Sequence, residues 1–334
     1  MTSRELVTKV LNHEPVDRVP RDLWAISGVV QFRKDEYDRL RAEYPMDMTK
    51  SPWCYGPGDK VRPMDEKTGE YTDAWGCVWR VGQPGLAGEV KGPAISDWSQ
   101  LTNYKPPMEV LDNADFSRIN PFCAESTLFV RGGTATHPFE QLQFIRGTEN
   151  ALIDLAYGTK ELRQLLEMIH EFSCRAMRMT AETDVDAVSF MDDWGSQTAL
   201  LISPDMWREF FRPMYKDYCD IAHEKGKYVF MHSDGNIEAI YEDLIEVGVN
   251  ALNSQLFCMN IEGLGEKYGD KITFYGEIDR QKILPFGAAE DVREAVRRVK
   301  KALDPSTGGV IAQCEWGLND PYENIATVYD EWAK

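Results

Sequence analysis

The stretch Tyr228-Val229-Phe230-Met231-His232-Ser233-Asp234-Gly235-Asn236 decides the fold of this chain. It begins as a short apolar run, carries a histidine and an aspartate two residues apart at its end, and stops on Gly-Asn. An apolar run of this length between turn residues is typical of a fully buried strand. In a parallel barrel the carboxyl end of such a strand opens onto the active site. The stretch therefore predicts a buried strand that presents His232 and Asp234 for metal binding or proton transfer.

Three other apolar runs, at residues 186–192, 272–276 and 310–314, also lead into polar side chains. Because the carboxyl ends of parallel barrel strands meet at one mouth, we expect these polar groups to converge there. The side chains expected to line this common cavity are His232, Asp234, Glu277, Cys314 and at least one of Asp192 and Asp193.

Further outward, strand and helix signals alternate along the chain. This alternation predicts an α/β fold, a (β/α)8 TIM barrel that forms a single domain over residues 1–334. The stretch 47–125 is rich in Gly, Pro and Trp over most of its length, so we expect an irregular insertion or lid there, with a hairpin at 70–81. The expected strands are 21–25, 46–51, 127–132, 186–192, 227–232, 251–255, 272–276 and 310–314. The expected helices are 2–12, a pair within 139–181, 204–224, 237–247, 289–303 and 321–332.

Composition limits the classes of partner. The formal net charge of -18 argues against a nucleic-acid or anionic-membrane surface, because phosphate groups are held mainly by Lys and Arg. No signal-peptide core follows the amino terminus, and no apolar run approaches the roughly 18 residues that a spanning helix needs. The seven cysteines are scattered and odd in number, which suits reduced thiols. We therefore expect a cytoplasmic protein that binds neither membrane nor nucleic acid.

Each candidate ligand also has an ordinary structural explanation. His232 could be a buried histidine with one backbone partner, Asp234 a turn or helix cap, and Cys314 an inert buried thiol. Their positions at strand ends favour the functional interpretation. Together with Glu277 they form a set of ligands that zinc accepts, with a position left for a substrate. We therefore expect zinc on His232, Asp234 and Cys314, although no CxxC or HExxH spacing is present.

Carboxylates and aromatic residues complete the expected site. Asp192 and Asp193 follow one strand directly, and either could act as a general base, anchor a substrate or pair with an arginine. Glu277 is the third candidate catalytic carboxylate. Tryptophans near strand ends usually serve packing, but they could also wall a planar or apolar substrate. The candidate substrate-binding aromatic residues are Trp24, Trp194, Tyr275 and Trp316.

Several of these blocks together resemble the uroporphyrinogen decarboxylase superfamily. The resemblance covers nearly the whole chain and is weakest over residues 47–125. It is carried by Ser3-Arg4-Glu5-Leu6-Val7, Asp17-Arg18-Val19-Pro20, Met191-Asp192-Asp193-Trp194-Gly195-Ser196-Gln197, Ile202-Ser203-Pro204, Arg212-Pro213, His232-Ser233-Asp234-Gly235-Asn236, Gly276-Glu277-Ile278-Asp279 and Pro321-Tyr322-Glu323-Asn324-Ile325.

Two branches of the superfamily differ at positions that this chain shows. True uroporphyrinogen decarboxylases use an arginine-rich amino-terminal loop and a nearby aspartate without a cofactor, and residues 21–28 lack that arginine pattern. The corrinoid-dependent methyltransferases carry zinc on a His-x-Cys pair and a later Cys. His232 and Cys314 match this pattern, while Asp234 stands at the first cysteine. A carboxylate in place of a thiolate makes zinc a stronger Lewis acid, which suits the methyl-donor side of the reaction.

The resemblance thus implies a methyltransferase that moves a methyl group from a small O- or N-methylated compound to a corrinoid protein, assisted by zinc. One alternative is a cofactor-free decarboxylase of a tetrapyrrole or a smaller carboxylate, which predicts a basic pocket. Another is a non-catalytic subunit that binds a corrinoid or tetrapyrrole.

Overall fold

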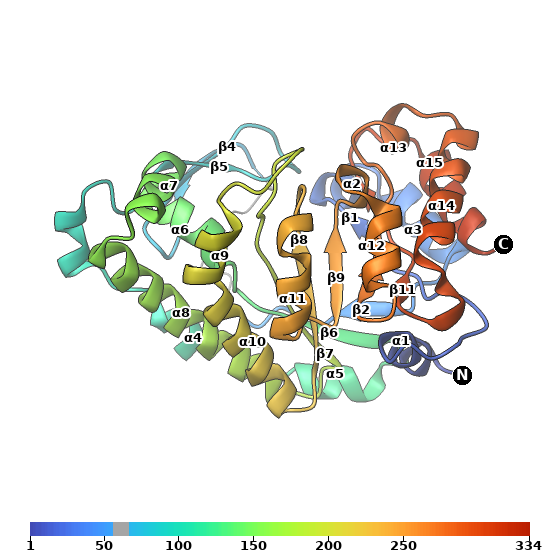
Figure 1. Cartoon of the computed structure of the whole chain (residues 1–334), viewed down its shortest axis with the longest axis horizontal. Helices are drawn as coiled ribbons and strands as arrows, with labels where there is room; N and C mark the ends of the chain where they lie inside the picture. Colours follow the sequence, from blue (N-terminus) through green and yellow to red (C-terminus); the bar gives the residue numbers. More distant parts are fainter. Residues whose placement is uncertain (56–66) are drawn as a thin grey trace.

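A computed structural model describes residues 1–55 and 67–334 of the chain, and an all-parallel sheet lies at its centre (Figure 1). Seven strands follow one another in the order β11-β10-β9-β8-β7-β6-β2. Their bounds are β2 Met48–Lys50, β6 Phe129–Gly133, β7 Ala187–Met191, β8 Tyr228–Ser233, β9 Ala251–Ser254, β10 Thr273–Tyr275 and β11 Val310–Ile311.

A further strand pair links the two edges of this curled sheet. β1 (Trp24–Ala25) runs parallel to β12 (Glu315–Trp316), which continues the direction of β11. The amide of Asp22 donates to the carbonyl of Ala312 at 2.9 Å on one side. On the other side, the amide just before β2 donates to the carbonyl of Arg21 at 2.8 Å. The predicted α/β class is confirmed, and the arrangement is TIM-barrel-like.

Helices run along the outside of the sheet, with α8, α10, α11 and α12 beside the strands in Figure 1. In the described residues none of them is both long and apolar enough to cross a membrane. Their bounds are α1 Ser3–Leu11, α2 Ser27–Phe32, α3 Lys34–Glu43, α4 Met108–Asp112, α5 Ile119–Glu125, α6 Pro138–Arg146, α7 Thr148–Tyr157, α8 Lys160–Ala181, α9 Pro204–Phe210, α10 Arg212–Glu224, α11 Tyr241–Val247, α12 Ile261–Tyr268, α13 Ile283–Phe286, α14 Ala289–Leu303 and α15 Tyr322–Trp332. Short 3-10 helices lie at Trp98–Asn103, Glu238–Ile240, Leu256–Cys258 and Pro305–Thr307.

Two of the expected helical stretches are broken more often than predicted. The stretch 139–181 contains three helices rather than two, because Gly147 (φ 77°) and Gly158 (φ 61°) adopt backbone angles that end a helix. The stretch 204–224 divides at Phe211, and Pro213 occupies the first turn of α10. Proline lacks the amide hydrogen that a continuous helix would need at this point.

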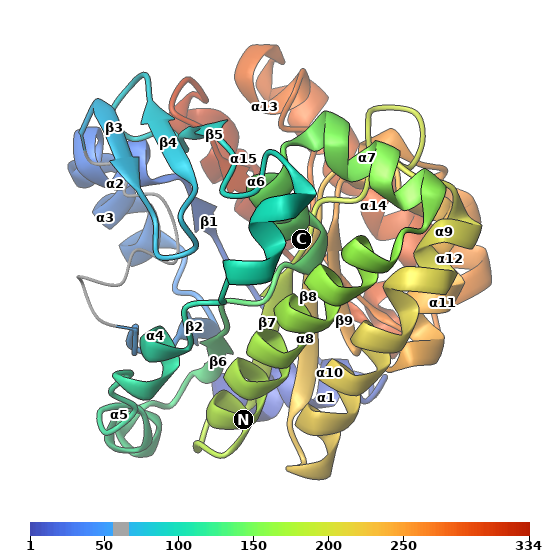
Figure 2. The same ribbon diagram turned by 90° about the vertical axis from the view of Figure 1, so that its left-hand side faces the viewer.

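The stretch 47–125 differs in part from the expected insertion. Its first residues form β2, a strand of the central sheet, so the stretch does not lie wholly outside the barrel. The hairpin at 70–81 is confirmed, because β3 (Gly69–Thr72) and β4 (Val78–Val81) pair antiparallel. With β5 (Glu89–Gly92) they form a separate sheet, seen beside α2 and α3 in Figure 2. Residues 56–66 lie outside the described residues, and a lid function stays a prediction.

The centre of the barrel has an apolar layer that α1 seals at the amino end of the strands. Each strand contributes an inward residue to this layer, and α1 packs against them through Val7, Val10 and Leu11. The inward residues of the layer are Met48, Phe129, Ala187, Phe230, Ala251, Tyr275 and Ile311. A larger apolar layer lies between the outer face of the strands and the surrounding helices. In the described part of the chain, the barrel is therefore closed at the amino ends of its strands.

Asp47, which is 1% exposed, ties the amino-terminal elements to the sheet. Its carboxylate accepts two hydrogen bonds from Arg18 (2.7 and 2.6 Å), one from Ser3 Oγ (2.6 Å) and one from the amide of Arg21 (2.8 Å). Burial opposes ionisation, but these donors outweigh it and lower the pKa of Asp47. One carboxylate thus joins α1, the segment before β1 and the start of β2.

We expect Asp47→Asn to lower the free energy of unfolding by about 2–3 kcal/mol at pH 7, since hydrogen bonds to a charged group contribute about 1.5–3 kcal/mol each and Asn keeps some of them. Because the folded pKa is depressed, this contribution is full above the unfolded pKa of about 3.9 and is lost as the pH falls through the folded value. Urea unfolding should therefore show that the difference in the free energy of unfolding between wild type and variant becomes smaller as the pH is lowered. Asp17→Asn, at an exposed position, is the control. A gap that is absent at pH 7 or independent of pH would contradict this role.

Candidate functional site

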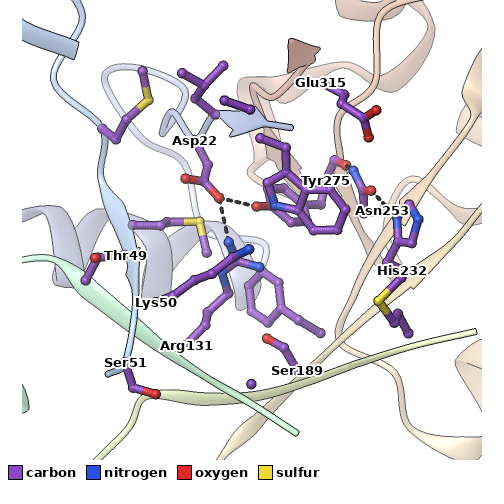
Figure 3. Close-up of a pocket in the computed structure, with 18 of the residues that line it drawn as sticks. Asp22, Thr49, Lys50, Ser51, Arg131, Ser189, His232, Asn253, Tyr275 and Glu315 are labelled. Carbon is purple, nitrogen blue, oxygen red and sulfur yellow. Dashed lines mark hydrogen bonds and ion pairs between the residues drawn. The ribbon is translucent and has the colours of Figure 1, made fainter. Parts of the chain in front are cut away.

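A polar layer lies directly above the apolar layer of the barrel. Because alternate residues of a strand face the same side, the residue two positions after each inward apolar residue also points inward. On five strands that residue is polar and lines one cavity of about 640 Å³. These residues are Lys50, Arg131, Ser189, His232 and Asn253 (Figure 3). Because every second residue of a strand faces inward, polar residues at the same level of five neighbouring strands surround the cavity.

His232 is held in one orientation by Asn253. The side-chain amide nitrogen of Asn253 donates to the carbonyl of Tyr275 and to Gln313 Oε1 (3.2 Å). Its oxygen is therefore the acceptor facing His232 Nδ1, at 2.6 Å, so Nδ1 must carry a hydrogen. Nε2 points the other way, 3.3 Å from a carboxylate oxygen of Asp234 and 3.6 Å from one of Asp193.

Asp193, His232 and Asp234 form a group that could hold a metal ion. One ligand atom from each lies within 4.8 Å of the others, and in the part of the chain that the structure describes no other group of three such residues meets this criterion. The donor set is one imidazole nitrogen and two carboxylates. The hydrogen bond from Nδ1 to Asn253 is the outer contact that typically orients a metal-binding histidine. The residues present therefore fit a divalent cation such as zinc.

Arg280 connects the acidic groups around His232. Its guanidinium contacts the carboxylates of Asp234 and Glu315, and its Nε lies 3.8 Å from Glu277. Burial raises the pKa of Glu277 to about 8, although Arg280 opposes the shift. Burial also disfavours the charged form of His232, but the carboxylates of Asp234, Asp193 and Glu277 outweigh it and raise its pKa to about 9. The pKa of Asp234 is lowered to about 2, because His232 and Arg280 outweigh its own burial.

A second network lies across the cavity. Arg131 donates to Asp22 Oδ2 at 2.6 Å, and the Tyr275 hydroxyl donates to the same oxygen (Figure 3). Trp24 lies between this network and the histidine. Its ring centroid is 4.8 Å from that of His232, and the Lys50 ammonium lies 5.3 Å from the Trp24 ring centroid.

Cys314 does not join the site, contrary to the ligand set expected from the sequence. It is fully buried, and its Sγ lies 3.7 Å from the Tyr329 hydroxyl. The reason is strand parity: Ile311 faces the interior, so Glu315 also faces it, and Cys314 points outward toward α15. Burial raises the pKa of the Cys314 thiol to about 12, which disfavours the thiolate that a metal needs. Glu315 lines the cavity at this strand end.

Parity also separates the two adjacent aspartates. Asp193 faces His232, whereas Asp192 is fully buried on the outer side of β7. The carboxylate of Asp192 accepts hydrogen bonds from the amides of Phe139 and Glu140 (2.8 Å each) and from the Tyr215 hydroxyl (2.9 Å). These donors lie in the first turn of α6 and in α10. The catalytic role predicted for Asp192 is therefore not supported by its position, which is that of an anchor for two helices.

The four aromatic residues predicted to contact substrate divide in the same way. Trp24 and Tyr275 line the cavity. Trp194 is instead stacked on Phe139, with centroids 4.2 Å apart, in the outer apolar layer. Trp316 is fully buried in that layer as well. Outward-facing aromatic residues near the strand ends cover the barrel rather than the cavity.

Some cavity and site residues were missed by the sequence analysis. Lys50, Ser189 and Asn253 line the cavity, and Arg280, in the loop after β10, contacts the cavity residue Glu315. The three strand residues could have been predicted from the alternation along each strand, because each lies two positions after an inward apolar residue. Arg280 had no comparable signal, since its place depends on the path of a loop.

Two glycines allow the loops after β7 and β8 to meet. Gly195 donates its amide hydrogen to the carbonyl of Asp234 at 3.0 Å, and a Cβ on Gly195 would lie 2.7 Å from the Cα of Gly235. The amide of Asp234 donates to Asp193 Oδ1 at 3.0 Å. This close backbone approach keeps the two carboxylates beside His232.

We expect Gly195→Ala to lower the free energy of unfolding by about 1–3 kcal/mol, because an added methyl group in a closely packed place forces the backbone apart. The control is Gly133→Ala, at a position where a Cβ would meet no heavy atom within 4 Å. Urea unfolding of both variants measures the difference. Equal stability of the two would contradict the close approach of these loops.

Comparisons with known proteins give a family model and a structural likeness. The model described as "Uroporphyrinogen decarboxylase (URO-D)" matches residues 129–333. No curated protein matches the chain. A solved methyltransferase from Methanosarcina mazei has a TM-score of 0.73 at 17% identity, with 100% of this chain and 98% of that chain covered. An endo-beta-1,4-xylanase from Gloeophyllum trabeum reaches a TM-score of 0.47 at 9% identity, covering 96% and 98%. The first likeness supports the fold, and the second carries no argument.

Proposed function

The chain belongs to the uroporphyrinogen decarboxylase (URO-D) family, and on this premise we propose that it is a metal-assisted methyltransferase. The methyl donor is a small O- or N-methylated compound, and the acceptor is the cobalt of a corrinoid carried by another protein. The observation that carries the proposal is the group Asp193, His232 and Asp234, whose histidine lines a cavity large enough for a small substrate. The architecture shared with the Methanosarcina mazei methyltransferase is consistent with it.

Charge balance supports a cation at this group. The carboxyl groups of Asp193, Asp234, Glu277 and Glu315 surround His232. Even with Glu277 protonated near neutral pH, three acidic groups remain, whereas Arg280 supplies one permanent positive charge. Such a cluster of carboxylates is costly to bury unless cations compensate it. A bound zinc ion would polarise the heteroatom that leaves the methyl group.

The chain's own residues have defined tasks in this proposal. Asn253 fixes the His232 ring so that Nε2 faces the carboxylates of Asp193 and Asp234. Glu277 holds a proton near neutral pH, because its pKa is raised to about 8. Its Oε1 is buried without a hydrogen-bond partner. A protonated carboxyl group at this place can deliver its proton to the departing oxygen or nitrogen.

We expect purified protein to bind about one equivalent of zinc. His232→Ala and Asp234→Ala should each weaken zinc binding at least tenfold, because each removes one of three ligands. Cys314→Ala should bind zinc as the wild type does, since its thiol faces Tyr329. Titration with zinc, followed by elemental analysis, measures this. His170→Ala, outside the site, is the histidine control. Loss of zinc in Cys314→Ala, or equal binding in all variants, would rule out the assignment.

For activity, we expect methylcobalamin to form when the zinc-loaded protein is incubated with cob(I)alamin and a panel of methoxylated aromatic compounds and methylamines. Glu277→Gln should lower the rate at least tenfold, because general acid catalysis typically contributes 10²–10⁴-fold. Absorption spectra of the corrinoid measure the product. A panel without any methylcobalamin, repeated with corrinoid proteins in place of free cobalamin, would contradict the proposal.

One observation favours a second candidate function. The cavity contains Lys50 and Arg131, and a basic pocket is what a decarboxylase of this family would need for its carboxylate substrate. Incubation with uroporphyrinogen tests this alternative, because coproporphyrinogen would appear only with decarboxylation. A protein that binds corrinoid or tetrapyrrole without either product would instead be a binding subunit.

A further inference from the structure

The cavity is cationic on one side although the chain is strongly acidic. Among the described residues that line it, Arg41, Lys50 and Arg131 are basic, and both acidic ones, Asp22 and Glu315, already contact an arginine. The formal net charge of the whole chain is -18, so this concentration of positive charge is local. Local positive charge in a cavity with apolar walls attracts an anionic ligand.

Arg131 is a buried cation, and in the described structure not all of its N–H groups donate a hydrogen bond. Its side chain is 4% exposed, and its guanidinium lies over the rings of Tyr275 (5.0 Å) and Phe230 (5.6 Å). Asp22 contacts only its Nη2, and Nε is buried without a hydrogen-bond partner. The nearby Ser189 Oγ also lacks a partner. A guanidinium has five donors, so one carboxylate bound through a single nitrogen leaves it under-satisfied.

Lys50 and Arg131 are register partners in β2 and β6, so their side chains leave the sheet side by side. Figure 3 shows both side chains beside Asp22 and across the cavity from His232. Trp24 bridges the two sides, with the Lys50 ammonium and the His232 ring each close to its indole. A ligand that packs on Trp24 can therefore reach Lys50 on one side and His232 on the other.

We propose that Lys50 and Arg131 form a subsite for the carboxylate of a small methylated acid, whose methyl-bearing heteroatom then faces His232. Arg131 supplies planar donors for the carboxylate oxygens, and Trp24 supports the body of the ligand. The inference rests on the proposed function, because it names the class of methyl donor.

The test measures binding without catalysis. Isothermal titration of the wild type with 4-methoxybenzoate and with the neutral 4-methoxybenzamide isolates the effect of the anion, because the two differ little in size. N,N-dimethylglycine and its amide form a second pair. We expect the acid to bind at least tenfold more tightly than the amide in at least one pair, as a charge-assisted hydrogen bond implies.

Variants then assign this preference to the subsite. Lys50→Gln should weaken binding of the acid about tenfold and change binding of the amide less than twofold. Arg131→Lys keeps the charge and should lose part of the preference, because it removes the planar donor pair. Lys160→Gln, at an exposed position on α8, is the matched control. Thermal unfolding confirms that each variant is folded.

The proposal would be overturned by equal affinity for acid and amide in both pairs, by no saturable binding of either acid, or by a preference that Lys50→Gln leaves intact. These outcomes are separate from failure of the proposed function. A preference for the acid without methylcobalamin formation would retain the subsite and reject methyl transfer. Methyl transfer from neutral donors only would retain the proposed function and reject the carboxylate subsite.

Discussion

The alternation of inward and outward residues along the strands governs this structure. Because α1 closes the barrel at one end, the inward positions near that end are mostly apolar, and the polar one there, Thr273, donates its hydroxyl hydrogen to the carbonyl of Val10 in α1. Phe230 and His232 show the rule within a single strand. The cavity begins at the level where the inward residues of the strands change from apolar to polar. The polar side chains that line it lie two residues after the inward apolar ones. The same alternation places Asp192, Cys314 and Trp316 among the helices.

The site itself is organised by compensation of charge. The carboxyl groups of Asp234, Glu277 and Glu315 converge from three strand ends, and Arg280 lies among them. Without positive charge this cluster would be costly to bury, and Arg280 and His232 supply it through their contacts with the carboxylates. A divalent ion would compete with the same positive groups for the carboxylates. On the other side of the cavity the charges are reversed, because there the carboxylate of Asp22 compensates the buried guanidinium of Arg131.

The sequence made several particular elements predictable. The strand that contains His232 ends as expected because its apolar run and the Asp-Gly-Asn turn leave little choice. His232 and Asp234 lie close together as predicted, because they stand two residues apart at the end of one strand. Cys314 was misplaced because the prediction considered how close a residue lies to the strand end and neglected which face it occupies. Counting in twos from Ile311 would have selected Glu315.

What the sequence by itself determined is the α/β class, the position of most strands, the resemblance to the family and the placement of His232 and Asp234 at one strand end. These follow from local periodicity and from short motifs, which need no knowledge of distant contacts. Only the tertiary structure decided that Lys50 lies beside Arg131, that Asn253 orients His232, and that Arg280 contacts Glu315. Each of these contacts depends on strand order, register or loop path, and the free energy that fixes them comes from packing between segments that are far apart in the chain.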